Sequence, residues 1–130
     1  MTVVFTAVAF AASVDIRFDH PDFDSSWRGV RYEIPCTKLA GESRTTVDFR
    51  ADISTWGDVL SINVLSDSPG NPVLHVDTAS KSRVRGTMRV DVAERSYTLR
   101  VVVTKANGGT FEDSESFEIY NDSNGTCPYQ

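Results

Sequence analysis

The sequence has few residues of the kinds that carry out chemistry, with only two cysteines and two histidines in 130 residues. His20 and His75 lie in separate segments with no second ligand nearby in sequence, so we expect each at the surface or at a sheet edge. There is no Gly-x-Ser-x-Gly elbow and no helical His-Glu motif, and two cysteines fit no zinc pattern and no disulfide-rich scaffold. The sequence therefore predicts a protein that is not an enzyme and that holds no cofactor and no metal.

Positive charge and long apolar runs are also scarce. Eighteen acidic residues outnumber thirteen basic ones, which gives a net charge of −5, whereas nucleic acid attracts proteins with a broad basic face. The uncharged run from Thr2 to Val14 is shorter than the roughly 20 apolar residues of a membrane span. We therefore expect neither nucleic-acid binding nor membrane insertion, but one globular domain with a single core.

The uncharged run admits three interpretations. Its polar Thr2, Thr6 and Ser13 fall within roughly 40° of one another at about 100° per residue, which favours an amphipathic helix. A secretory signal peptide usually begins with basic residues, which are missing here, and a strand is the third interpretation. A helix this short must pack on something, so we favour a dimerisation helix over residues 1–13 with an interface made by Val3, Val4, Phe5, Val8 and Phe10.

From residue 14 on, the sequence predicts seven or eight short strands, at 14–18, 30–34, 47–53, 59–65, 73–76, 88–92, 97–104 and 111–119, and apolar and polar residues alternate in several of them. Such alternation is typical of half-buried strands, and turn signals such as Asn107-Gly108-Gly109 separate the segments. The 59–65 segment is apolar at most positions, which predicts a central strand, whereas 73–76 is short and suits an edge. The prediction is a mainly β fold, an immunoglobulin- or fibronectin III-like antiparallel β-sandwich over residues 14–120, followed by a tail over 121–130.

Cys36 and Cys127 each lie beside a proline. If they pair, they fasten the C-terminal tail and close a long loop, worth ~4–5 kcal/mol in the chain-entropy model; free thiols and a bond between subunits are the alternatives. Two N-glycosylation sequons begin at Asn121 and Asn124. Together these features predict a secreted, extracellular protein.

The order of these features resembles the fungal immunomodulatory proteins. The resemblance rests on the apolar run that leads into Val14-Asp15-Ile16-Arg17-Phe18-Asp19, on Pro21 and Trp27-Arg28-Gly29, on the strand 97–103, and on the ending Phe117-Glu118-Ile119-Tyr120-Asn121. It implies an N-terminal helix and first strand that pack against a second subunit, a fibronectin III-like domain, and sugar recognition at Trp27 and Tyr120. The longer acidic loop before Trp27, the cysteines and the tail from Asp122 depart from the family pattern.

Four residues are candidates for a glycan site, because an aromatic face beside polar groups suits a sugar ring and its hydroxyls. They are Trp27, Arg28, Tyr120 and Trp56. A tryptophan packed in the core under a loop is the alternative for both tryptophans, and we favour it for Trp56.

Two charged clusters have a possible binding role. Asp19, Asp22 and Asp24 could offer oxygen ligands to Ca²⁺, but the glycine and terminal glutamate of a known Ca²⁺ loop are missing, so we favour a solvated loop. In the second cluster, Arg83, Arg85 and Arg89 share parity and so share one face of a strand, close to Lys81. This cluster could contact sulfated glycans or an acidic partner, although a solvated sheet face is the interpretation we favour.

We expect a secreted, non-enzymatic, immunomodulatory and lectin-like protein that binds glycans or glycoprotein receptors on immune cells as a homodimer. A structural or adhesive immunoglobulin-like module of a larger surface protein is the alternative. A small Ca²⁺-dependent binding module is a third hypothesis.

Overall fold

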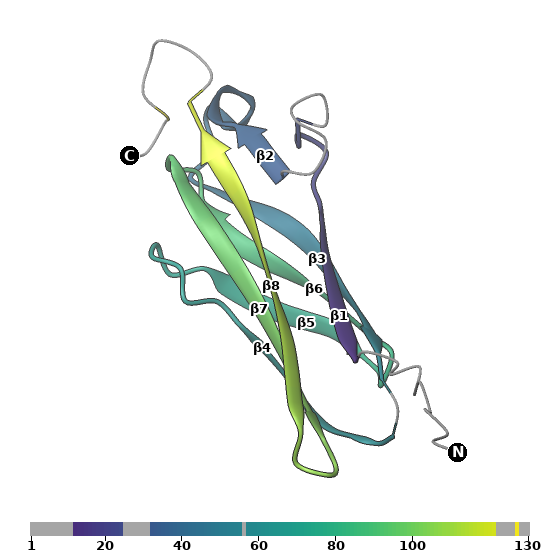
Figure 1. The fold of residues 1–130 in the computed structure, drawn as a ribbon. Helices are drawn as coiled ribbons and strands as arrows, with labels where there is room; N and C mark the ends of the chain where they lie inside the picture. Colours follow the sequence, from purple (N-terminus) through teal and green to yellow (C-terminus); the bar gives the residue numbers. More distant parts are fainter. Residues whose placement is uncertain (1–11, 25–31, 56, 122–126, 128–130) are drawn as a thin grey trace, which may run out of the picture.

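The computed structural model describes residues 12–24, 32–55, 57–121 and 127 of the chain (Figure 1). These ranges contain one four-residue 3-10 helix, η1 (Cys36–Leu39), and eight strands, where the sequence predicts seven or eight. The strands are β1 (Ser13–Asp19), β2 (Tyr32–Pro35), β3 (Arg44–Ser54), β4 (Val59–Leu65), β5 (Val73–Ala79), β6 (Arg83–Asp91), β7 (Arg95–Lys105) and β8 (Thr110–Tyr120). Within the same ranges, no helix has the length and apolar character needed to cross a bilayer.

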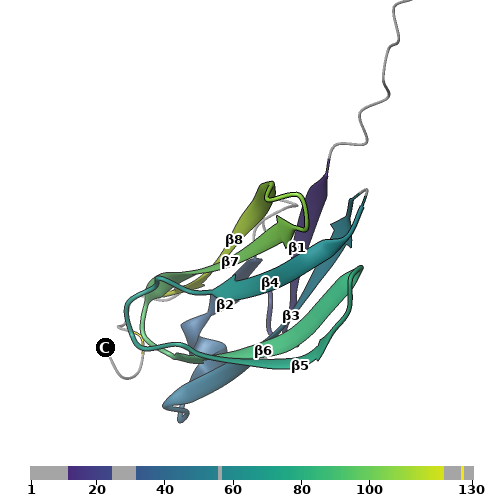
Figure 2. The same cartoon turned by 90° about the horizontal axis from the view of Figure 1, so that it is seen from below.

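The strands form two four-stranded sheets that face each other as a β-sandwich (Figure 2). One sheet has the order β1-β3-β6-β5 and the other has the order β2-β8-β7-β4. Neighbouring strands are antiparallel except β2 and β8, which run parallel with Ile34 opposite Ile119. The prediction of a wholly antiparallel sandwich is therefore wrong at this pair, where strands far apart in the sequence are joined by a long excursion through both sheets.

The core lies between the sheets because alternate residues of each strand point inward. In β6, for example, Val84, Met88 and Val90 are fully buried, while the arginines between them are exposed. The facing strand β7 contributes four fully buried side chains, Tyr97, Leu99, Val101 and Val103. Burial of each such side chain contributes about 1.5–3 kcal/mol relative to exposure, so this strand pair forms the centre of the core.

Tyr97 fixes the corner between β6 and β7. Its ring is buried and stacks on Phe117 with ring centroids 5.4 Å apart, and its hydroxyl donates a hydrogen bond of 2.9 Å to the carbonyl of Asp91. Burial raises the pKa of this phenol, because the charged form would lose its hydration. One side chain thus joins the inter-sheet core to the chain reversal six residues upstream.

Gly86 allows the closest approach within the first sheet. It lies opposite Phe49 in β3, and a Cβ atom built on it would clash with the backbone carbonyl of His75 in β5 and come within 2.6 Å of Cζ of Phe49. The phenylalanine ring occupies the space that a side chain at position 86 would need. Glycine is therefore required here by packing on both neighbouring strands.

Strand β4 lies at the edge of its sheet, so the prediction that this apolar segment is central is wrong. Ile62 and Val64 are half-buried on the inner side, whereas Leu60 and Leu65 are exposed. Apolar residues on both faces of a strand usually indicate cover on both faces, but here only β7 pairs with β4 among the described strands. The prediction that the 73–76 segment is an edge strand is confirmed, and β5 extends it to Ala79.

The start of β1 limits the predicted N-terminal helix. Ser13 is the first residue of β1, so the helix expected over residues 1–13 is wrong at its last residue. Residues 1–11 lie outside the described part of the chain, and with them lie the five predicted interface residues Val3, Val4, Phe5, Val8 and Phe10. The dimer seam stays a prediction.

A disulfide joins Cys36 to Cys127 within the chain, which decides among the three alternatives for these cysteines. Both side chains are buried, with 1% and 2% exposed. Cys36 is the first residue of η1, directly after β2. The bond therefore holds Cys127, which follows β8 in the chain, against the turn after β2. The sequence distance between the two is 91 residues, and the bond therefore closes a loop that contains most of the sandwich.

Candidate functional site

Most residues predicted to bind glycans lie outside the described ranges, namely Trp27, Arg28 and Trp56. Tyr120 is described, and it ends β8 with a half-buried side chain whose hydroxyl donates a 3.2 Å hydrogen bond to Oδ2 of Asp24. Of the two predicted glycosylation sites, Asn121 directly follows β8 and is half-buried, whereas Asn124 is outside the described ranges. The predicted aromatic site therefore stays a prediction. Of its four residues, the structure describes Tyr120, which is hydrogen-bonded to Asp24.

His20 is buried, so the expectation that it lies at the surface is wrong. Its Nδ1 accepts a 3.0 Å hydrogen bond from the backbone N–H of Asp22, which leaves the proton on Nε2 to be donated to Oγ1 of Thr45 at 2.9 Å. Its ring also lies edge-on to Phe23. A histidine with both nitrogens engaged in this way holds the loop after β1 against β3, and we assign it a structural role.

His75, in contrast, is exposed on the edge strand β5, as expected. Its Nε2 lies 3.0 Å from Oδ1 of Asp77 on the same strand. Across the described ranges, no three His, Cys, Asp or Glu side chains are grouped so that they could hold a metal ion.

The outward side of the β1-β3-β6-β5 sheet carries charged side chains in ordered rows, and we call this surface the charged face. The strand register places Arg17 of β1 opposite Arg50 of β3, and Arg50 opposite Arg85 of β6. Directly opposed residues of antiparallel strands point to the same side with Cβ atoms about 4.5–5.5 Å apart. The three arginines therefore form a basic row across three strands.

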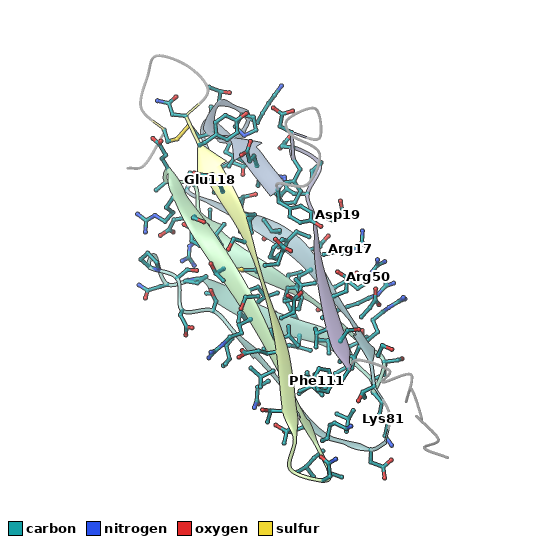
Figure 3. All side chains as sticks on the ribbon, viewed as in Figure 1. Arg17, Asp19, Arg50, Lys81, Phe111 and Glu118 are labelled. Atoms are coloured by element: carbon teal, nitrogen blue, oxygen red, sulfur yellow. A yellow bond between two sulfur atoms is a disulfide. The ribbon has the colours of Figure 1, made fainter. Side chains whose placement is uncertain are left out.

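Rows of aspartates flank the basic row on both sides. Asp15 lies opposite Asp52 on one side, and Asp19 lies opposite Asp48 on the other. Figure 3 shows Arg17, Asp19 and Arg50 along this side of the molecule. The alternation of charge from row to row follows from the alternation of Asp and Arg along β1 and β3, where every second residue faces outward.

Ion pairs neutralise part of the charged face. Nε of Arg17 donates to Asp15 at 3.2 Å, and Nε of Arg83 donates to Oδ1 of Asp52 at 2.7 Å. The first bond raises the pKa of Arg17, and the second holds the pKa of Asp52 below its ordinary value. Nε of Arg50 lies 3.2 Å from Asp52 without forming a hydrogen bond to it, so this donor is shielded from solvent and unsatisfied.

Two arginines of β6 are the exception. The burial pattern confirms that Arg83, Arg85 and Arg89 share the exposed side of β6, as their parity predicts. Arg85 and Arg89 make no ion pair with any residue in the described ranges, whereas Lys81 lies 3.7 Å from Asp58, away from this row. Exposed and unpaired guanidinium groups keep their full donor capacity for a ligand.

A shallow depression of about 570 Å³ lies over the basic row. Tyr32, the first residue of β2, is one of its lining residues. The charged residues that line it are Arg17, Arg50, Arg85, Asp19, Asp48 and Asp77. A second, smaller depression of about 270 Å³ lies on the other sheet and is lined mainly by glutamates and serines. Unlike the second, the first depression presents guanidinium donors beside carboxylate acceptors, an arrangement that can bind an anionic group together with neighbouring hydroxyls.

Sequence reasoning identified Arg83, Arg85 and Arg89 but missed Arg17 and Arg50, which complete the basic row. Their outward positions follow from strand alternation, but their alignment depends on the pairing register between strands. No family model, curated protein or solved structure matches this chain.

Proposed function

We propose that this chain is an extracellular, non-enzymatic recognition module of the immunoglobulin type, which binds acidic glycans of cell-surface glycoproteins at the charged face. The observation that carries the proposal is the alignment of Arg17, Arg50 and Arg85 in one row over a 570 Å³ depression. Guanidinium groups form bidentate hydrogen bonds with sulfate or carboxylate groups. The flanking aspartates accept hydrogen bonds from sugar hydroxyls.

The strand order supports the immunoglobulin type. In that fold, strands A, B, E and D form one sheet and C, F and G form the other, which corresponds to β1-β3-β6-β5 against β4-β7-β8, with β2 added beside β8. The hydroxyl of Tyr97 at the start of β7 reaches back to the carbonyl of Asp91, as the tyrosine of such sandwiches does at the same corner. Fold alone does not give function, so the ligand is argued from the face.

The disulfide supports the extracellular location, because such bonds persist in oxidising compartments. A sulfate group carries a fixed negative charge at neutral pH and pairs well with a guanidinium group. Arg85, which has no ion pair within the described ranges, is the donor most available to it.

The test is isothermal titration calorimetry with a highly sulfated heparin hexasaccharide and with the same hexasaccharide after desulfation. We expect Arg85→Gln to weaken binding of the sulfated probe about tenfold, because one charge-assisted contact contributes about 1.5 kcal/mol. Arg100→Gln is the control, because Arg100 is a half-buried arginine on the opposite sheet whose Nε lies 3.7 Å from Glu112, and it should leave the affinity within about twofold.

Equal affinity of wild type and Arg85→Gln, or equal binding of the sulfated and desulfated probes, would overturn the proposal. Binding that is lost only on replacing Tyr120 would instead support the site predicted around Trp27 and Tyr120. The resemblance to fungal immunomodulatory proteins and the role of residues 1–13 in dimerisation are proposals of the same standing. Deletion of residues 1–11, which leaves β1 intact, followed by a mass measurement in solution, tests the second.

A further inference from the structure

The two edge strands on the open side of the sandwich carry exposed apolar side chains. Across the described ranges, the four large hydrophobic side chains that are exposed all belong to β4 and β5, Leu60 (70% exposed), Leu65 (36%), Val73 (51%) and Val76 (41%). These two strands are the edges of their respective sheets on the same side of the sandwich (Figure 2). Half-buried Ile62 and Val64 continue the apolar stripe from Leu60 inward along β4.

The other edge strands carry features that oppose pairing with another chain. On β1, the N–H of Ile16 donates to the carboxylate of Asp113 from β8, at 3.2 Å, so the free edge is capped by a charge. Strand β2 has four residues and ends with Pro35. Strand β5 carries the His75–Asp77 pair and a register shift at its centre. Charges, proline, short length and bulges are the means by which proteins protect sheet edges.

Strand β4 has no charged residue in its seven positions, Val59-Leu60-Ser61-Ile62-Asn63-Val64-Leu65. Its one irregularity is a bulge at its start, between Val59 and Ser61, and the pairing with β7 is regular from Ser61 to Leu65. From Ser61 to Leu65, the backbone groups on its outer side therefore have neither a bulge nor a charge to protect them, and they lie next to an apolar stripe.

The sequence of β4 is also complementary to itself. If the segment from Leu60 to Val64 is laid antiparallel against a second copy about Ile62, Ser61 faces Asn63, and Leu60, at the bulge, lies beside Val64. Within this segment apolar residues meet apolar residues and polar residues meet polar ones, which a two-fold symmetric interface requires.

We propose that β4 pairs with β4 of a second copy of this chain, antiparallel and centred on Ile62. The pairing joins the two β2-β8-β7-β4 sheets into one continuous sheet and covers Leu60. The interface closes on itself, so the product is a dimer and not a filament. This inference is independent of the ligand proposed above, but a dimer would present two charged faces and raise avidity for a multivalent ligand.

The first test is the mass of the full chain in solution across a concentration series. We expect a dimer for wild type and a monomer for Leu60→Lys, because a lysine on this edge opposes strand addition. The side chain of Leu60 is 70% exposed, so the substitution leaves the core intact, and a thermal melt verifies folding. Ser114→Lys is the matched control, because it adds the same charge at an exposed position of β8 in the same sheet.

The second test detects the proposed pairing register through a covalent bond, so its positive result does not depend on disrupting the dimer. In a full chain with Ser61→Cys and Asn63→Cys, residue 61 of one copy faces residue 63 of the other at a distance that a disulfide can span. Air oxidation should give a covalent dimer on a non-reducing gel, and a Ser114→Cys chain should give none. A monomeric wild type at every concentration overturns the proposal, as does a dimer that survives Leu60→Lys and is lost on deleting residues 1–11.

Discussion

Loss of the Cys36–Cys127 disulfide should remove a large share of the stability of this domain. The bond closes a loop of 91 residues, for which the chain-entropy relation gives about 15.5 cal/mol/K, or about 4.6 kcal/mol at 25 °C. Domains are typically stable by about 5–15 kcal/mol. With about 2.1 cal/mol/K of unfolding entropy per residue, the 130-residue chain has about 270 cal/mol/K, so the loss corresponds to a fall in Tm of about 17 °C.

The assay is differential scanning calorimetry of wild type, of wild type under reducing conditions, and of the Cys36→Ala/Cys127→Ala variant. Reduction tests the cross-link without any change of packing, so its agreement with the double variant separates chain entropy from lost side-chain volume. Each single alanine variant should unfold within about 2 °C of the double variant, the equivalent of about 0.5 kcal/mol, because either change abolishes the same bond. A decrease in Tm of less than about 4 °C would refute the entropic reasoning. So would decreases in the two single variants that add up to the decrease in the double variant.

Three further changes test the packing and the ion pairs. Gly86→Ala should destabilise the fold by about 2–3 kcal/mol, since the new methyl group meets backbone on one side and a ring on the other, and a urea unfolding curve measures it. Tyr97→Phe should cost about 1–2 kcal/mol in the same assay, because the carbonyl of half-buried Asp91 loses its donor. Because the pKa of Tyr97 is raised, the contribution of this group to stability is full below the ordinary phenol pKa of 10.0 and is lost as pH rises beyond it. Wild type and Tyr97→Phe with the same dependence of stability on pH in the alkaline range would contradict this. The lowered pKa of Asp52 stabilises the fold above the ordinary carboxyl pKa of 3.8, and this contribution is lost as pH falls through the folded value. Arg83→Gln should therefore make the loss of stability at acidic pH slightly smaller. The effect is slight because the ion pair is exposed and screened.

The strand content of this fold could be predicted from the sequence because one face of nearly every strand is buried. The alternation in β6 and β7 is regular over nine and eleven residues, and period-two patterns are read reliably under such conditions. Strand β4 shows where the pattern fails. Its apolar residues indicate burial on both sides, but whether a strand is central or at an edge depends on its neighbours, which the local sequence does not encode.

The candidate site was predictable only in part for a related reason. Arg83, Arg85 and Arg89 lie on one strand, so parity alone places them on one face. Arg17 and Arg50 join the row through inter-strand register, and a slip of one residue would move them to the core side. The burial of His20 likewise depends on Thr45 in β3, a residue 25 positions away in the chain.

The position of the disulfide also determines how the chain responds to mechanical force. The start of β1 and the end of β8 lie at opposite ends of the molecule (Figure 1), so tension along the chain runs the length of the sandwich. It passes from β1 and β2 through the Cys36–Cys127 bond and bypasses the 91-residue loop, whose extended length is about 300 Å. Under oxidising conditions β1 and β2 lie on the covalent path of the force, while β3 to β8 lie within the bypassed loop. Reduction of one bond therefore converts a short, stiff link into a long, extensible one.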